Sequence, residues 1–379
     1  MRIALVSESF LPSTNGVTTS VRKVLEHLRD TGHEAIVIVP AAGAPAEYAG
    51  FRVHEVPAVA YRQFPVGLPS PQVQRLIADF RPDVIHAASP FLLGGQAITA
   101  GTRLGIPSVA IFQTDVAGYA RRNRLGAMTG VAWRAVRWIH EGATVTLVPS
   151  SASMDDLERA GIRRLARWGR GVDLETYHPR NRGTTAATRL RSRIAPNGET
   201  IIGYVGRLAP EKQVERLRVL RGLPGIRIAI VGDGPSSASV KRELRGMPVT
   251  HLGSLSGADL AAAYAALDVF VHTGEEETFG QTLQEAHASG LPVVAPRAGG
   301  PVDLVEHGVT GYLFDAGGDE QLRAYVEALA LDLSLRARMG EAGRRSVLGR
   351  SWRGICQELL AHYRAAIATH SNALADSLG

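Results

Sequence analysis

The sequence predicts an α/β protein of two doubly wound, parallel-sheet domains with a cleft between them. The chain has 379 residues, more than one domain usually holds, so two domains are expected. Short β-branched runs alternate with amphipathic helical stretches, which is the pattern of right-handed βαβ crossovers. The same alternation begins again in the second half of the chain, so each half predicts a sheet of its own.

In the first half, a strand at 2–7 is followed by a helix at 18–32 with Val21, Val24, Leu25 and Leu28 on one face. A second helix is expected at 71–80. The remaining strands of this half end in proline, glycine or small polar residues, and are expected at 35–40, 82–87, 106–112 and 144–150.

The second half repeats the alternation. Its strands are expected at 200–207, 226–232, 249–253, 268–273 and 291–296, and a final helix at 351–368. Between the halves lies a polar stretch with proline and glycine at both ends, which indicates a linker. The predicted boundaries are an N-terminal domain at 1–175, a linker at 176–198 and a C-terminal domain at 199–351.

Composition limits the class of protein to which this chain can belong. The apolar fraction of 45% is that of a soluble globular protein. Cys356 is the only cysteine, which excludes an internal disulfide and fits a reducing compartment. The N-terminal apolar run is too short for a signal sequence and no stretch reaches 18 apolar residues. We therefore expect a cytoplasmic protein, one that can associate with the cytoplasmic face of the membrane.

The net charge of +6 does not indicate a nucleic-acid partner. Arginines are scattered along the whole chain, and no recognisable nucleic-acid-binding module occurs. Phosphate-bearing substrates or an anionic membrane surface are the favoured partners for this charge.

The stretch EEETFGQTLQE, residues 275–285, places two carboxylates around a helix start. Glu277 precedes the expected helix and Glu285 lies inside it. The unpaired amides at the helix start, with the positive end of the helix dipole, favour a phosphate; they belong to Phe279, Gly280, Gln281 and Thr282. The glutamates could then accept hydrogen bonds from hydroxyls on either side of that phosphate, as a nucleotide-sugar presents them. The alternative is a helix whose acids only complement its dipole.

Two further loops follow predicted strands. GRLAPEK, 206–212, places Arg207 and Lys212 at the carboxyl end of a strand, where two cations can neutralise a diphosphate. A plain surface role for the pair is the alternative. Asn15 and Gly16 form an expected tight turn tolerant of positive φ. The dinucleotide and P-loop fingerprints are missing, as are DxD, HExxH and paired cysteines, so no metal is expected.

These motifs, in this order, resemble those of retaining glycosyltransferases of the GT-B fold in glycosyltransferase family 4, over nearly the whole chain. Glu277 and Glu285 match the family's E-x7-E motif. RGVDLETYHP (170–179) and PRAGGPVDLVEHGVTGYLF (296–314) resemble two more of its segments. The resemblance implies two Rossmann-like domains, with the C-terminal helix 352–379 packing back on the first.

The resemblance also implies roles for the site residues. Glu277 would contact the donor sugar and Glu285 the nucleotide ribose. Arg207 and Lys212 would hold the diphosphate, together with the amides that run from Phe279 through Gly280, Gln281 and Thr282 to Leu283. The loop of Asn15 and Gly16 would close over the donor phosphates. The implied mechanism is metal-independent and needs no cofactor beyond the nucleotide-sugar co-substrate, because the leaving diphosphate takes the acceptor's proton.

The sequence departs from the family pattern at two positions. Asn15 stands where the family often has glycine, and Gln113, in FQTD, replaces its first-domain histidine. A glutamine donates a hydrogen bond to a sugar hydroxyl but cannot carry charge. Asp115 could orient an acceptor hydroxyl.

SESFLPSTNGV (7–17) and FQTDVAGYA (112–120) most resemble actinobacterial GDP-mannose-dependent α-mannosyltransferases. The expected function is transfer of a hexose, most of all mannose from GDP-mannose, to a lipid-linked or glycosylated acceptor. The alternatives are a UDP-sugar-dependent enzyme of the same fold and, more remotely, a nucleotide-sugar epimerase or a non-catalytic binding protein.

The segment 119–142 is the candidate for peripheral membrane contact. It has an apolar face at helical spacing and an arginine- and tryptophan-bearing face that could rest on anionic headgroups. The alternative is a helix packed on the core with a solvated outer face.

Overall fold

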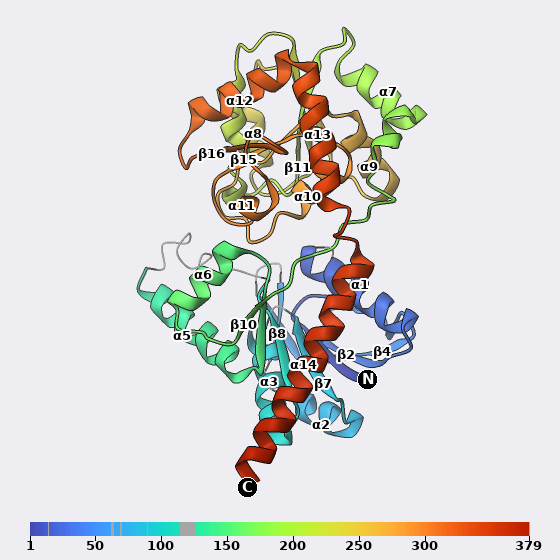
Figure 1. Ribbon diagram of the computed structural model, residues 1–379, viewed down its shortest axis with the longest axis vertical. Coiled ribbons are helices and arrows are strands. Elements are labelled where there is room, and N and C mark those ends of the chain that lie inside the picture. Colours follow the sequence, from blue (N-terminus) through green and yellow to red (C-terminus); the bar gives the residue numbers. More distant parts are fainter. Residues whose placement is uncertain (14, 62–63, 69, 89, 114–125, 379) are drawn as a thin grey trace. The chain divides into compact units, whose positions relative to one another are not determined.

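A computed structural model describes residues 1–13, 15–61, 64–68, 70–88, 90–113 and 126–378. The chain forms two compact units (Figure 1). The first contains Met1–Arg170 together with Trp352–Gly379, and the second contains Gly171–Ser351. Each unit has its own parallel sheet with helices on both faces, as the alternation of strands and helices predicts.

The first unit is built on a sheet of order β10-β9-β8-β7-β1-β2-β4-β3, parallel except for β3. Its strands are β1 (Arg2–Ser7), β2 (Glu34–Pro40), β3 (Glu47–Tyr48), β4 (Phe51–Val56), β7 (Val84–Ala88), β8 (Ser108–Ile111), β9 (Val145–Val148) and β10 (Leu165–Arg167). A separate hairpin pairs β5 (Ala58–Tyr61) with β6 (Phe64–Gly67). The helices are α1 (Gly16–Asp30), α2 (Pro71–Phe80), α3 (Leu92–Leu104), α5 (Gly126–Gly142), α6 (Ser151–Arg159) and α14 (Trp352–Leu378).

Side chains along β1 alternate between the two faces of the sheet, and each face is covered by its own layer of helices. Ile3 and Leu5 pack with α1 and α14 on one face, whereas Ala4 and Val6 pack with α2 and α3 on the other. Figure 1 shows α14 lying along the sheet beside α1. The C-terminal helix is thus part of the first unit's core, to which it contributes Ile355, Cys356, Leu359, Leu360 and Tyr363.

The second unit has an all-parallel sheet of order β13-β12-β11-β14-β15-β16. Its strands are β11 (Thr200–Val205), β12 (Ile226–Val231), β13 (Val249–Gly253), β14 (Val269–Val271), β15 (Val293–Pro296) and β16 (Gly311–Phe314). Its α-helices are α7 (Thr185–Ile194), α8 (Ser237–Glu243), α9 (Gly257–Ala266), α10 (Gln281–Ala288), α11 (Pro301–Leu304), α12 (Asp319–Leu331) and α13 (Leu333–Val347). The 3₁₀ turns are η1 (Pro179–Gly183), η2 (Pro210–Lys212) and η3 (Val214–Leu220).

The expected linker, 176–198, is a folded part of the second unit. It contains η1 and α7, and both pack on α9. The physical reason is Asp268, a buried acid at the start of β14. Arg182 of η1 forms an ion pair with one carboxylate oxygen of Asp268, and Arg191 of α7 lies 2.8 Å from the other. These two ion pairs hold the polar segment against the sheet.

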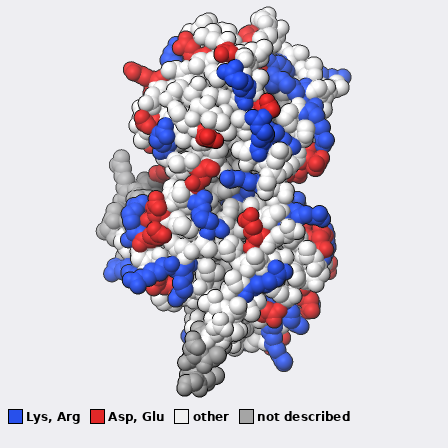
Figure 2. Space-filling view, in the orientation of Figure 1, with Lys and Arg blue, Asp and Glu red and all other residues white. Residues whose placement is uncertain are grey.

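Charges on the surface are mixed in sign. On the face drawn in Figure 2, lysine and arginine side chains are interspersed with aspartate and glutamate, and no single-sign stripe crosses it.

Candidate functional site

The strand order of the second sheet determines where a ligand site is expected. The order reverses between β11 and β14, and open α/β sheets bind ligands beyond the carboxyl ends of the strands at such a reversal. The loop after β11 carries Arg207 and Lys212, and the loop after β14 carries Glu277. The two sequence motifs therefore follow the two strands that flank this position.

The structure joins Lys212 and Glu277 directly. Lys212 Nζ lies 2.7 Å from Glu277 Oε2, and both side chains are mostly buried. The backbones of the two loops are also held together, because the Thr273 hydroxyl donates to the Lys212 carbonyl at 2.6 Å. Gly274 permits this approach: a Cβ there would lie 2.6 Å from the carbonyl oxygen of Glu211.

Glu277 is held in its ionised form. Burial acts to raise its pKa, but Lys212, His272 and the Phe279 amide outweigh burial and lower the pKa to about 2. His272, at the end of β14, is buried with Nε2 4.0 Å from Glu277 Oε2. Burial lowers the pKa of His272 to about 4, so this imidazole is neutral near pH 7. The ionised Glu277 carboxylate, paired with the Lys212 ammonium group, therefore lies beyond the carboxyl ends of β11 and β14.

The start of α10 supplies backbone donors, but fewer than predicted. The Phe279 amide points to Glu277 Oε1 at 3.4 Å, and the Leu283 amide donates to the Gly280 carbonyl at 3.0 Å. The amides of Gln281 and Thr282 lie in the first turn, where the helix offers no acceptor. The amides that this helix start leaves for an anion are thus those of Gln281 and Thr282, and their binding of a phosphate stays a prediction.

Glu285 lies in a different environment from Glu277. Its Oε2 accepts a hydrogen bond from the Tyr264 hydroxyl at 2.9 Å, and the Tyr177 ring packs edge-on against Tyr264. Burial raises the pKa of Glu285 to about 7, and the negative charge of Asp173 acts in the same direction, against hydrogen bonds from Tyr264 and Gln281. The E-x7-E carboxylates consequently differ in charge state: Glu277 is ionised at neutral pH and Glu285 is poised to titrate.

Arg207 does not join this cluster. Its side chain is exposed and, within the part of the chain that the structure describes, forms no hydrogen bond or ion pair. Its carbonyl accepts from the Tyr204 hydroxyl at 3.1 Å. The structure thus places Lys212 beside Glu277. The contact of Arg207 with a diphosphate stays a prediction.

In the first unit, the structure corrects the interpretation of Asn15 and Gly16. Asn15 is extended and caps α1, since its side chain accepts from the amides of Val17 and Thr18 at 2.9 and 3.0 Å. Gly16 is the first residue of α1 and has no positive φ. The expected tight turn is wrong because an asparagine before a helix is stabilised more as a cap than in a left-handed turn.

The end of β8 carries the other predicted first-unit residue. Gln113 is buried, and its Oε1 accepts a hydrogen bond from Arg170 Nη2 at 2.8 Å. Asp115 lies outside the described residues.

Comparison with known proteins agrees with this architecture. A model of the family described as Glycosyltransferase Family 4 matches residues 14–176, and one described as Glycosyl transferases group 1 matches residues 188–346. The chain is 48% identical to a GDP-mannose-dependent alpha-mannosyltransferase of Mycolicibacterium smegmatis, over 98% of this chain and 99% of the relative.

A sulfoquinovosyl transferase of Arabidopsis thaliana is 36% identical over 97% of this chain and 74% of its own. Among solved structures, the Anabaena protein HepE in complex with UDP superposes with a TM-score of 0.80 at 22% identity, covering 96% of this chain and all of that one. The chain is a family 4 glycosyltransferase. Its two parallel-sheet units have the GT-B fold, and membership in this family of transferases is evidence against the epimerase and binding-protein alternatives.

Sequence reasoning missed the residues that fix the Glu277 loop of this glycosyltransferase. The Gly300 amide donates to the Glu277 carbonyl at 2.6 Å. Arg216, buried in η3, lies 2.8 Å from Glu275 and 2.6 Å from Asp319. The sequence signal for Arg216 was an arginine within the apolar run of η3. Its partners, Glu275 and Asp319, are far away in sequence.

Replacing Arg216 with methionine is expected to destabilise the glycosyltransferase by about 2–4 kcal/mol, because two carboxylates lose a buried partner. Urea denaturation measures the free energy of unfolding. The matched control is Arg218→Met on the same turn, whose guanidinium is half exposed and 3.9 Å from Asp319; its effect should stay within about 0.5 kcal/mol. Equal effects would contradict the anchoring role of Arg216.

Replacing Glu285 with glutamine is expected to change how stability depends on pH. The folded-state pKa of about 7 exceeds the ordinary value of 4.5, so folding favours the protonated form. The resulting stability is complete below about pH 4.5 and is lost as pH rises through 7. The glutamine variant should therefore gain about 1–3 kcal/mol relative to the parent between pH 5 and 8. Glu276→Gln, at an exposed position, should show no such trend, and parallel curves for parent and Glu285→Gln would contradict the raised pKa.

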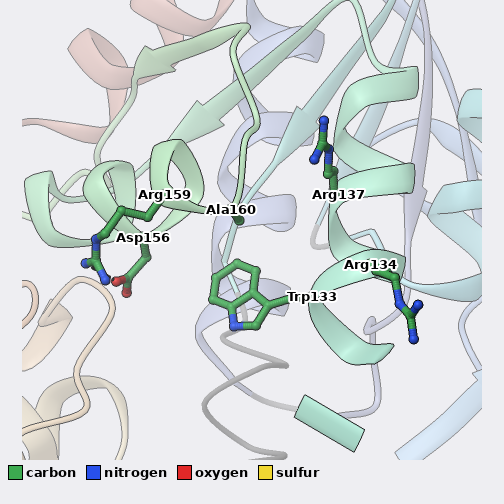
Figure 3. A pocket seen from close by; sticks show the side chains of 6 residues that line it. All are labelled: Trp133, Arg134, Arg137, Asp156, Arg159 and Ala160. Carbon is green, nitrogen blue, oxygen red and sulfur yellow. Dashed lines mark hydrogen bonds and ion pairs between the residues drawn. The ribbon is translucent and has the colours of Figure 1, made fainter. Parts of the chain in front are cut away.

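A second feature of the enzyme lies between α5 and α6. A pocket of about 370 Å³ is lined by Trp133, Arg134, Arg137, Asp156, Arg159 and Ala160. In Figure 3 the Trp133 ring lies between the two helices, and Arg137 and Arg134 extend from α5. Trp133 also packs against the core cluster of Phe112 and Val136, so it is the flanking Trp138, 65% exposed, that faces solvent. No helix among the described residues is long and apolar enough to cross a membrane.

Proposed function

We propose that this glycosyltransferase transfers mannose from GDP-mannose to a lipid-linked or glycosylated acceptor, with retention of configuration. The observation that carries the proposal is the 48% identity, over nearly the whole of both chains, to a GDP-mannose-dependent alpha-mannosyltransferase. Substrate-contacting residues are spread along a chain of this fold, so similarity over its full length supports the same donor more than similarity of one motif would.

The second unit has the groups that this donor needs. The amides at the start of α10 and the ammonium group of Lys212 suit a diphosphate, and Arg207 is the further cation proposed for it. Glu277, ionised and beside Lys212, is suited to accept hydrogen bonds from sugar hydroxyls. Glu285, eight residues further on, is proposed to accept from the ribose hydroxyls.

In the proposed mechanism the acceptor hydroxyl attacks the anomeric carbon from the face that the diphosphate leaves. The bond between the anomeric carbon and the phosphate oxygen breaks, the new glycosidic bond forms on the same face, and the acceptor's proton passes to the leaving diphosphate oxygen. Lys212 and the α10 amides stabilise the charge that develops on the diphosphate. No metal ion takes part in this proposal, because fixed cations and amides perform the neutralisation. Gln113 and Asp115 remain candidate acceptor contacts.

A UDP-activated donor is the second candidate. The Arabidopsis relative, 36% identical over 97% of this chain, is a sulfoquinovosyl transferase, so closely related chains use more than one sugar. The two candidates differ in the base and in the sugar, and both use the same diphosphate site.

A donor panel tests the proposal. GDP-mannose, UDP-glucose, UDP-GlcNAc and UDP-galactose are compared by calorimetric binding and by transfer to a glycolipid acceptor, with and without EDTA. GDP-mannose should bind at least about tenfold more tightly than any UDP-sugar, which is about 1.4 kcal/mol, and transfer should proceed equally in EDTA. Preference for a UDP-sugar would overturn the donor assignment, and strict dependence on added Mg²⁺ or Mn²⁺ would overturn the metal-free mechanism.

We also propose that α5 and α6 bring the enzyme to anionic lipid, where a lipid-linked acceptor would be found. Three arginines and one aspartate line their pocket, and Trp138 of α5 is exposed. Such a surface binds anionic headgroups through charge and an interfacial aromatic ring.

Reversing two of these charges, Arg134→Glu with Arg137→Glu, should reduce co-sedimentation with phosphatidylglycerol vesicles at least about tenfold, since each basic residue near the surface contributes about 1 kcal/mol. Binding to phosphatidylcholine vesicles should be weak for all variants. Arg103→Glu, an exposed arginine of α3, is the control. Undiminished binding of the double variant, or an equal loss in the control, would contradict the membrane role.

A further inference from the structure

Gly16, Gln113 and Arg170 lie together in the first unit, although almost 100 residues separate the first two. Gly16 begins α1, Gln113 follows β8, and Arg170 follows β10. A Cβ built on Gly16 would overlap the guanidinium of Arg170, whose Nη2 donates to Gln113 Oε1 at 2.8 Å. The carboxyl ends of parallel strands meet at one edge of a sheet, which is where ligands bind in this class of fold.

The glycine at position 16 leaves room for this contact. Its backbone is not in the left-handed region, so another residue could adopt the same conformation. It is also the first residue of a helix, where alanine is favourable. The space that a side chain would need is filled by the far end of Arg170. A side chain at position 16 would therefore displace the guanidinium of Arg170.

The guanidinium also fixes the orientation of Gln113. Arginine has five N–H donors and no acceptor, so only the oxygen of the Gln113 amide can face it. The Nε2 group of the same amide then points away from Arg170 with two donors. Gln113 is 7% exposed, and a buried amide held on one side has little freedom to turn over.

We propose that Arg170 is a positioning residue for glycosyl transfer: it holds the Gln113 amide so that Nε2 donates to an oxygen, such as a sugar hydroxyl, of the bound substrate. The permanent charge of Arg170 also supplies a cation next to a glutamine that cannot carry one. The role of this pair in transfer rests on the proposed function, whereas the contact of Arg170 with position 16 does not.

Three variants separate positioning from mere support. Gln113→Glu keeps two oxygens for Arg170 but removes the Nε2 donors, so kcat should fall at least about tenfold while the melting temperature is kept or raised. Gly16→Ala should displace the guanidinium and lower kcat similarly, with little change in unfolding. Arg170→Lys, which keeps the charge without the fork of donors, should recover more activity than Arg170→Gln. Arg163→Gln, at an exposed position of the same unit, is the control and should match the parent.

A double-mutant cycle completes the test. Gly16→Ala should cost little further kcat in the Arg170→Gln background, because the group it displaces is already absent. Additive losses, or parental kcat in Gln113→Glu, would overturn the proposal. All assays use whichever donor the parent turns over best in the panel, so a wrong assignment of GDP-mannose would not be mistaken for failure of the positioning role.

Discussion

Replacing Glu277 with glutamine is expected to lower turnover by about 10²–10³-fold, the range found when a preorganised electrostatic contact to the reacting group is removed. The variant keeps the size of the side chain but loses the charge that Lys212 holds in place. Affinity for GDP should not fall, and is expected to rise, because Lys212 no longer shares its charge with a carboxylate 2.7 Å away.

Steady-state kinetics and calorimetry with GDP measure the two quantities separately. Glu276→Gln is the matched control, since this neighbour lies in the same loop with an exposed side chain; its kcat should stay within about twofold of the parent. Equal losses of turnover and of GDP affinity in Glu277→Gln would move Glu277 from the sugar to the nucleotide.

Replacing Lys212 with methionine is expected to have the second largest effect. The proposed charge-assisted contact to the diphosphate would be lost, which should weaken GDP binding by about 10–100-fold. The variant should also be less stable at pH 7, because Glu277 remains ionised and buried without its partner. Unchanged GDP affinity by calorimetry would remove Lys212 from the diphosphate site.

The loss of stability in Lys212→Met is expected to depend on pH. In the parent, the lowered pKa of Glu277 gives stability that is present above the ordinary value near 4.5 and is lost as pH falls towards 2. The difference between parent and variant should therefore be largest at pH 7 and shrink as pH falls towards 2, because a protonated Glu277 no longer needs the ammonium group of Lys212. Adding Glu277→Gln should restore part of the stability at pH 7. Lys241→Met, an exposed lysine of α8, should leave both GDP affinity and stability unchanged.

Local patterns were enough to predict the sheets. The strands 2–7, 200–205 and 226–231 are β-branched runs buried on both faces, and the glycine and proline that end them are near in sequence. Two of the strands that were missed lack such a buried run: 51–56 alternates buried apolar residues with charged or polar ones, and 311–314 has only four residues. Segment 176–198 was mistaken for a linker because the acid that holds it, Asp268, lies more than 70 residues away.

The candidate site shows the same limit. The E-x7-E motif, Lys212 and the α10 helix start were visible as spacings within a few residues. That Lys212 contacts Glu277 depends on two adjacent parallel strands, and no spacing in the sequence states it. Glu277 and Glu285 differ because Lys212 lowers the pKa of Glu277, whereas burial, helped by the charge of Asp173, raises the pKa of Glu285. Arg170 could not be selected because its partners, Gly16 and Gln113, meet it only in the folded sheet.

The position of α14 bears on how the chain folds during synthesis. The first unit's core includes residues such as Leu359 and Tyr363, which are made after the entire second unit. At about 5–20 residues per second, a ribosome takes roughly 10–40 s to add the intervening residues. During that time the nascent first sheet exposes the apolar face that α14 will cover. The second unit is continuous in sequence, so its synthesis is complete before that of the first unit. Chaperones that bind exposed apolar surface therefore have most to protect in the first unit, although most of it is translated first.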